Sequence, residues 1–245
     1  MRIIKTKTYE EMSAIAAGII GGQVLLKPNC VLGLATGSSP IGTYKDLVKS
    51  YEDGVLDFSE VRTVNLDEYC GLDGTNPNSY RYFMNKNLFE KVDIRMEATH
   101  VPSGAVKSDE EAEQYDAQIK AAGGIDLQLL GIGNNGHIAF NEASDHLIAV
   151  AHTEKLTQST IDANARFFEK KEDVPTMAIT MGMGDILAAK KVVLAATGLA
   201  KVPAIRGLIM DDVITTQNPS TMLKMHEDAV VVIDRELADA VGYRA

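Results

Sequence analysis

Residues 125–142 read Ile-Asp-Leu-Gln-Leu-Leu-Gly-Ile-Gly-Asn-Asn-Gly-His-Ile-Ala-Phe-Asn-Glu. Its first part, Ile125 to Leu130, is a mainly apolar run that predicts a buried strand. Glycines and a lone His137 follow, and Glu142 comes five residues after the histidine. Glycines after a strand are typical of a backbone that turns sharply or approaches a ligand. A histidine and a glutamate placed there are able to exchange protons with a bound molecule. A glycine turn with a hydrogen-bonded histidine explains this stretch alone equally well.

Apolar strands and amphipathic helices alternate on both sides of this stretch. Strands are predicted at residues 1–6, 31–36, 61–66, 125–130, 147–151, 177–181, 192–197 and 230–234. Helices are predicted after Thr8, from Pro40, at 80–88, from Ser108, at 159–168 and near Pro203. This alternation predicts an α/β fold, with a mainly parallel sheet and helices on both faces. Since we find no linker, repeat or low-complexity segment, we take residues 1–245 as a single domain.

Composition narrows the class of protein. The chain has 245 residues and a formal net charge of −10, which argues against non-specific binding to nucleic acid or to an anionic membrane. No apolar run reaches the length of a membrane span. The two cysteines, Cys30 and Cys70, form no CxxC pair. Together with the high methionine content and the lack of a signal peptide, they lead us to expect the reducing cytoplasm.

Small residues and hydroxyls follow the strand at residues 31–36, in the sequence Thr36-Gly37-Ser38-Ser39-Pro40. Pro40 suits the first helical position and Ser39 suits the cap before it. Backbone N–H groups at a helix start favour an anion, so this segment is a candidate phosphate cradle. It matches neither a Walker A motif nor GxGxxG, so no nucleotide is implied. An ordinary N-cap turn is the alternative.

A second polar cluster, Asn65-Leu66-Asp67-Glu68-Tyr69, ends the strand at residues 61–66. Asp67 is a candidate carboxylate base for a carbon-bound proton, and a solvated pair of acids is the alternative. We interpret Cys70 as an inert thiol, because the sequence identifies no base for it.

Other polar residues allow further tests of the site. His137 and Glu142 alone are too few ligands for a metal, so we predict no metal site. We expect His146 and His152 in a mobile surface segment. Arg166 and Lys201 are surface charges unless the fold brings them to the phosphate cradle.

Taken together, these stretches resemble the glucosamine-6-phosphate deaminase (isomerase) family, and the similarity spans essentially the whole chain. The matching segments are 32–40, 65–69 with Gly71-Leu72, 131–142, 164–168 and 198–201. The resemblance implies a three-layer Rossmann-like α/β sandwich. It also implies a small-molecule substrate, D-glucosamine 6-phosphate, which reacts with water to give fructose 6-phosphate and ammonia. No metal or other cofactor is implied, and a monomer and a homo-oligomer both remain open.

The resemblance also implies roles for individual residues. Asp67 would move a proton between C2 and C1 of the sugar. His137 would assist ring opening, with Glu142 as its partner and Asn135 beside it. A mobile lid at about residues 152–180 would carry one of the phosphate ligands. The residues implied to hold the phosphate are Thr36, Gly37, Ser38, Ser39, Arg166 and Lys201.

Two positions depart from the family pattern. Many members have Asp where this chain has Asn135, which supplies no charge and leaves Glu142 as the one matched carboxylate for His137. Many members also have Pro after the Asn-Glu pair, where this chain has Ala143. The loop therefore lacks a fixed φ, and the segment 143–151 is the weakest part of the match.

Two alternative functions, a lactonase and a sugar-phosphate sensor, fit the sequence less well than the deaminase. A 6-phosphogluconolactonase typically has a Leu-Phe-Pro-Gly type stretch after its Gly-His turn, whereas this chain has Ile138-Ala139-Phe140-Asn141-Glu142. A sugar-phosphate-sensing module of a transcription regulator normally follows a helix-turn-helix. The first matching strand begins at Val31, which leaves no room for one, and the chain is acidic.

Overall fold

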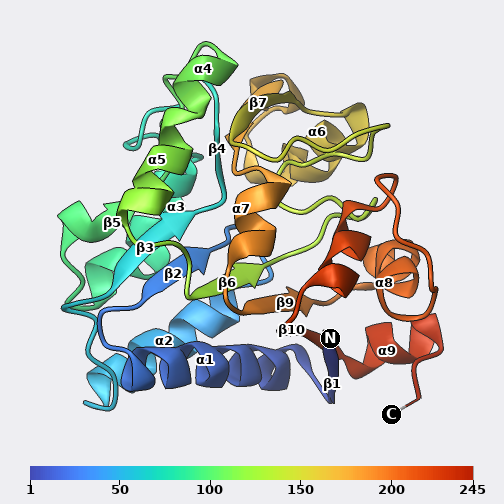
Figure 1. Cartoon of the computed structure of the whole chain (residues 1–245), viewed down its shortest axis with the longest axis horizontal. Helices are drawn as coiled ribbons and strands as arrows, with labels where there is room; N and C mark the ends of the chain where they lie inside the picture. The colour runs from blue at the N-terminus through green and yellow to red at the C-terminus, as the bar shows by residue number, and fades with distance from the viewer. Residues whose placement is uncertain (245) are drawn as a thin grey trace.

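The computed structural model describes residues 1–244, and a sheet of seven strands lies at the centre of that part of the chain (Figure 1). All neighbouring strands in this sheet pair in parallel. The order across the sheet is β1 (Arg2–Thr6), β10 (Ala229–Asp234), β9 (Val192–Ala196), β6 (Leu127–Leu130), β2 (Val31–Leu34), β3 (Arg62–Asn65) and β5 (Thr99–His100). The strands β2, β6, β9 and β10 are buried along their whole length, as is usual for parallel strands covered on both faces. The predicted parallel sheet is confirmed.

Helices surround this sheet. The α-helices are α1 (Tyr9–Leu26), α2 (Ile41–Glu52), α3 (Tyr80–Asn87), α4 (Asp109–Ala112), α5 (Gln114–Ala121), α6 (Gln158–Asn164), α7 (Met183–Ala188), α8 (Val202–Ile209) and α9 (Arg235–Val241). Short 3-10 helices are η1 (Phe89–Lys91), η2 (Met96–Ala98), η3 (Ala165–Phe167), η4 (Lys171–Asp173), η5 (Leu199–Lys201) and η6 (Pro219–Met225). In Figure 1, α1 and α2 lie together on one side of the central strands, and α5 and α7 lie on the other. The fold is thus the expected Rossmann-like sandwich. Among residues 1–244, no helix is both long and apolar enough to cross a bilayer.

Two of the predicted helix starts have side-chain caps. The Thr8 hydroxyl accepts a hydrogen bond from the Glu11 N–H at 3.2 Å, and the Ser108 hydroxyl accepts one from the Glu111 N–H at 3.4 Å. Each cap satisfies a backbone donor that has no partner inside the helix. These local signals therefore place the starts of α1 and α4 correctly.

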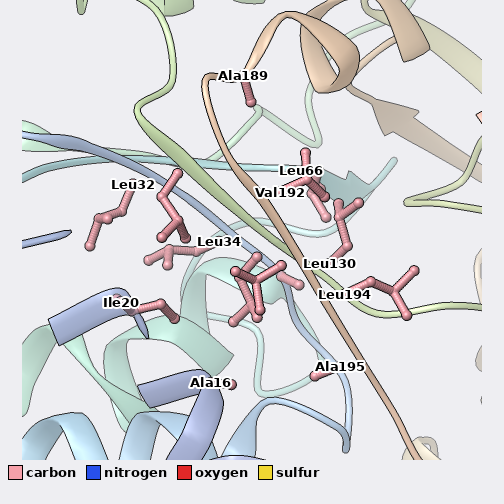
Figure 2. Close-up of a cluster of buried hydrophobic side chains, with 14 of the residues drawn as sticks. Ala16, Ile20, Leu32, Leu34, Leu66, Leu130, Ala189, Val192, Leu194 and Ala195 are labelled. Atoms are coloured by element: carbon pink, nitrogen blue, oxygen red, sulfur yellow. The ribbon is translucent and has the colours of Figure 1, made fainter. Parts of the chain in front are cut away.

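The face of α1 that packs on the sheet has the predicted helical spacing. Ala16 and Ile20 are one turn apart and fully buried, and Figure 2 shows them beside the strand that carries Leu32 and Leu34. Burial of an aliphatic side chain such as Ile20 contributes about 1.5–3 kcal/mol to folding. Helix α1 packs against α2, β10 and β9, and its first residue, Tyr9, reaches the loop that follows β2.

The order of strands in the sheet reverses between β2 and β6. From β2 the sheet continues with β3 and β5 on one side, whereas β6, β9 and β10 extend it on the other. In parallel α/β sheets, ligands bind beyond the carboxyl ends of the strands at such a point. The loops that follow β3, β2, β6 and β9 therefore meet there. These loops contain, respectively, Asp67, residues 36–39, His137 and Lys201.

A second, smaller sheet lies beyond these carboxyl ends. It consists of β4 (Asp67–Tyr69), β8 (Met177–Thr180) and β7 (His152–Lys155), paired antiparallel in that order. The acidic segment after β3 thus forms a strand of its own, and β8 holds it in place. The chain between β7 and β8 contains α6, η3 and η4.

Three local predictions are wrong. Residues 147–151 form no strand, because the carbonyls of Ile148 and Ala149 accept hydrogen bonds from the start of α7 instead. His152 is not on a mobile surface segment: it begins β7 and is 2% exposed. Ser39 does not cap α2, which begins one residue later than expected, after Pro40 and without a side-chain cap.

Candidate active site

The four loops enclose a cavity of about 880 Å³. The structure brings together at its wall nearly all the residues predicted for the site. Those that line it are Thr36, Gly37, Ser38, Ser39, Asp67, Asn135, His137, Arg166 and Lys201. Glu142 is 5% exposed and contacts His137 from behind. The cavity therefore combines an anion cradle, two cations and acid–base groups.

The candidate phosphate cradle, residues 36–39, is held from both sides by tyrosines. The Tyr9 hydroxyl lies 3.2 Å from the carbonyls of both Ser38 and Ser39, and it accepts a hydrogen bond from the Gly42 N–H at 2.9 Å. The Tyr44 hydroxyl donates to the Ala35 carbonyl. These contacts explain why α2 needs no serine cap. The support of the cradle by these two tyrosines was not predicted, since nothing in the sequence links Tyr9 to a loop some thirty residues away.

Two basic side chains from different parts of the chain line the same cavity as this cradle. An Arg166 guanidinium nitrogen lies 3.4 Å from the Ser38 hydroxyl oxygen, and the Lys201 ammonium donates to the Ile132 carbonyl at 2.6 Å. Burial lowers the pKa of Lys201 to about 8, and the charge of Arg166 adds to that effect. The pKa shift therefore agrees with two cations that face one space, where an anion would relieve their repulsion.

Asp67 lies at the start of β4 and is 7% exposed. Burial raises the pKa of its carboxyl group to about 8, and the neighbouring charge of Glu68 contributes to the increase. The Glu68 carboxylate binds backbone N–H groups instead of facing the cavity. Its carboxylate accepts hydrogen bonds from the N–H groups of Tyr69, Tyr80 and Arg81 at 2.9–3.0 Å, and so holds the start of α3. Of the two adjacent acids, only Asp67 lines the cavity.

Asn135 links the backbone of His137 to the Glu142 carboxylate by hydrogen bonds. His137 Nδ1 lies 3.5 Å from Glu142 Oε2, and the Asn135 amide donates to the same oxygen at 2.8 Å. The Asn135 side-chain carbonyl accepts from the His137 N–H at 3.2 Å. Burial alone would raise the pKa of Glu142, but His137, Thr160 and Asn135 together lower it to about 2. Glu142 is therefore an anion that lies beside the imidazole. Asn135 supports this pair without adding charge.

Gly133 makes room for the His137 ring. A Cβ atom at Gly133 would lie 2.2 Å from the Cε1 atom of His137. We expect Gly133→Ala to displace the ring and lower kcat for the reaction of this site by about 10–100-fold, because small misplacements of an acid–base group are costly. Steady-state kinetics with a thermal unfolding curve checks this. Gly18→Ala is the control, since a Cβ there also meets no atom within 4 Å and the residue lies in α1, outside the cavity lining. Equal losses in both variants would contradict the role of Gly133.

Aromatic side chains form an apolar wall that the sequence analysis did not assign to the site. Tyr80 stacks on Phe140 with ring centroids 6.1 Å apart, and Tyr69 contacts both Phe140 and Phe168 at 5.6 Å. All four line the cavity. Since Phe168 follows Arg166 closely in sequence, this cluster also anchors the segment that carries the arginine.

Metal ligands and thiols play no evident part in this arrangement. Within residues 1–244, no group of three or more His, Cys, Asp or Glu side chains is placed to hold a metal ion. Cys30 and Cys70 are free thiols, and burial raises the pKa of Cys70. A thiol with a raised pKa is a poor nucleophile at neutral pH.

Fold and site together define a class: a Rossmann-like α/β protein that offers an anion cradle and an acid–base group in one cavity. The family of glucosamine-6-phosphate isomerases and 6-phosphogluconolactonases matches residues 13–232. The chain is 52% identical over 242 residues to a glucosamine-6-phosphate deaminase from Clostridium beijerinckii, with 98% of this chain and 100% of the relative covered. It is 53% identical over 233 residues to one from Lachnoclostridium phytofermentans, with 95% and 98% covered.

Solved structures agree with this match. A monomeric glucosamine-6-phosphate deaminase, 40% identical, superposes with a TM-score of 0.95 over 98% of this chain and 100% of that one. A 6-phosphogluconolactonase from Thermotoga maritima is 17% identical and superposes with a TM-score of 0.74 over 96% and 99% of the two chains, so its likeness extends to the fold alone. The chain belongs to the glucosamine-6-phosphate isomerase/6-phosphogluconolactonase family.

Proposed function

We propose that the chain converts D-glucosamine 6-phosphate and water to D-fructose 6-phosphate and ammonia. The observation that carries the proposal is a single cavity in which the cradle, Arg166 and Lys201 face the same space as Asp67 and His137. Relatives of about half identity over nearly the whole chain are named glucosamine-6-phosphate deaminases. The named lactonases are under 20% identical, which supports the deaminase over the lactonase.

The first step opens the sugar ring. The aldose is closed in solution, so one group must supply a proton to the ring oxygen while the proton of the C1 hydroxyl leaves. His137 supplies the acid–base function, and the Glu142 carboxylate lies 3.5 Å from its Nδ1 atom. Asn135 holds that carboxylate in place through its amide.

The central step moves a proton from C2 to C1 of the open chain. The Asp67 carboxylate takes the C2 proton, which leaves an enolamine, and returns it to C1. The product is an imine at C2. Water adds to this imine and ammonia leaves, which gives the ketose. A raised pKa suits Asp67 to this work, because a base with a pKa near the working pH both takes and returns a proton.

The phosphate lies away from the bonds that change. Its contacts with residues 36–39, Arg166 and Lys201 therefore supply binding energy that positions the reacting end. We also propose that the segment from β7 to β8, residues 152–180, is a lid, since it carries Arg166 on the short helix η3. Residues 1–245 form one catalytic domain in this proposal. Its place is the cytoplasm, where free thiols such as Cys30 and Cys70 persist.

A direct assay tests the proposed reaction. The purified chain is incubated with glucosamine 6-phosphate and, separately, with 6-phosphogluconolactone, and release of ammonia is compared with hydrolysis of the lactone. Galactosamine 6-phosphate is included because the two sugars differ in one epimeric hydroxyl. Turnover of the lactone without ammonia release would refute the deaminase proposal. Binding of the sugar phosphates without turnover of any of them would identify a sensor.

The rate is expected to depend on pH through two groups in the free enzyme. Asp67 must lose its proton before it acts as a base, so kcat/KM rises as the pH approaches about 8. Lys201 loses its charge as the pH passes about 8, so phosphate capture weakens above it. A bell-shaped profile results. Lys201→Arg keeps the charge at high pH and should remove the falling limb, and a limb that persists in this variant would show that Lys201 is not its cause.

A further inference from the structure

Glu142 uses its two carboxylate oxygens for different parts of the molecule. Oε2 faces His137 and Asn135, as described above. Oε1 accepts hydrogen bonds from two hydroxyls of the segment between β7 and β8: from Thr157 at 3.2 Å and from Thr160. Hydrogen bonds to an ionised carboxylate are stronger than those between neutral groups. One buried anion therefore joins the histidine to the start of α6.

Helix α6 depends on this contact for its position. Thr157 caps the helix through the Thr160 N–H, and Thr160 is the one buried residue of α6. The remaining residues of the helix are exposed or only half-buried. An element with so little burial is held by few interactions, and losing one of them shifts it readily.

The same helix leads directly to the phosphate-binding arginine. Arg166 lies in η3, immediately after the end of α6 and six residues beyond Thr160, which corresponds to about 9 Å of helix. Its guanidinium faces Ser38 in the cradle. A displacement at Thr160 is thus carried along a short, stiff segment to Arg166.

We propose that Thr160, aided by Thr157, is a positioning residue that docks α6 on Glu142 and so couples the phosphate contact of Arg166 to the ring-opening group His137. This coupling rests on the function proposed above. It means that a correctly held phosphate and a correctly oriented imidazole require the same carboxylate. A sugar without its phosphate would lose catalytic rate as well as affinity.

Thr160→Val tests the coupling, because it removes the hydroxyl and keeps the shape of the side chain. We expect KM for glucosamine 6-phosphate to rise about tenfold and kcat to fall severalfold, as for loss of a hydrogen bond to a charged group. Thr160→Ser keeps the hydroxyl and should therefore have the wild-type values of both constants. In an Arg166→Ala background, Thr160→Val should leave KM nearly unchanged. Thr160→Ala repeats the test if Thr160→Val fails to fold.

Thr153→Val is the matched control. The Thr153 hydroxyl, in the same segment from β7 to β8, donates to Asp109 at 2.7 Å but does not contact Glu142. Wild-type constants are expected for it. Unchanged constants in Thr160→Val, or an effect on KM that persists undiminished without Arg166, would overturn the coupling.

Failure of the proposed function gives a different result. Wild-type protein would then release no ammonia. Calorimetry with inorganic phosphate still measures the Arg166 part of the coupling, as a weaker affinity in Thr160→Val than in wild type. Equal affinities in that titration would overturn the docking of α6 itself.

Discussion

Asp67→Asn is expected to lower kcat for ammonia release by about 10²–10⁴-fold, the usual contribution of a general base. The amide has nearly the shape of the carboxylate but cannot take the proton from C2. Affinity for the substrate should stay within a few-fold of wild type, because the proposed phosphate ligands Arg166 and Lys201 are untouched. Steady-state assays and calorimetric titration with the substrate separate the two quantities.

The folding stability of this variant supplies a check on its integrity. The pKa of Asp67 is raised in the folded state, so the folded protein binds this proton more tightly than the unfolded chain. The carboxylate therefore destabilises the fold increasingly as the pH rises from about 4 towards about 8. Asp67→Asn should unfold at a temperature equal to or above that of wild type at pH 9. The exposed Asp73→Asn is the control for the substitution itself, and full activity in Asp67→Asn would refute the assignment of the base.

The sheet and the main site loops could be predicted because their signals are local. Each buried parallel strand is a short apolar run, and each run ends in polar or glycine-rich sequence. Parallel strands align their carboxyl ends, so the polar ends after β2, β3, β6 and β9 had to meet at one edge. Once the segments were in one sheet, Asp67 and His137 faced a shared cavity even though some seventy residues separate them.

The supports of the site could not be predicted because they depend on packing between distant segments. Tyr9 reaches the cradle only after α1 has packed on α2 and on the sheet. Thr160 contacts Glu142 only because β7 and β8 pair and bring α6 over the cavity. The sequence shows a threonine at a helix start, and that pattern alone fits an ordinary cap as well.

The departure at Asn135 has a clear structural consequence. Its amide donates to Glu142 Oε2 while its carbonyl accepts from the backbone of His137. A carboxylate at this position could not donate that bond, and it would place a second negative charge beside Glu142. The amide thus provides by hydrogen bonding an orientation that does not require charge. Glu142 is the one matched carboxylate partner of His137. Its carboxylate accepts hydrogen bonds from three other side chains, those of Asn135, Thr157 and Thr160, which hold it in place.

His137→Gln is expected to lower kcat for glucosamine 6-phosphate by about 10²–10⁴-fold, because the amide neither gives nor takes a proton near neutral pH. The defect should be confined to ring opening. An analogue of the substrate that lacks both the 4- and the 5-hydroxyl can form neither the five- nor the six-membered ring, so its reaction begins with the proton transfer at Asp67. Ammonia release from this analogue should fall by less than tenfold in the variant.

His146→Gln is the matched control for this comparison. His146 is exposed, follows His137 in the same connection of the chain and does not line the cavity, so both substrates should react at wild-type rates. The ratio of the two rates decides the role of His137, since a general disturbance of the cavity slows both substrates alike. Equal losses on the closed sugar and on the analogue would contradict the ring-opening role of His137.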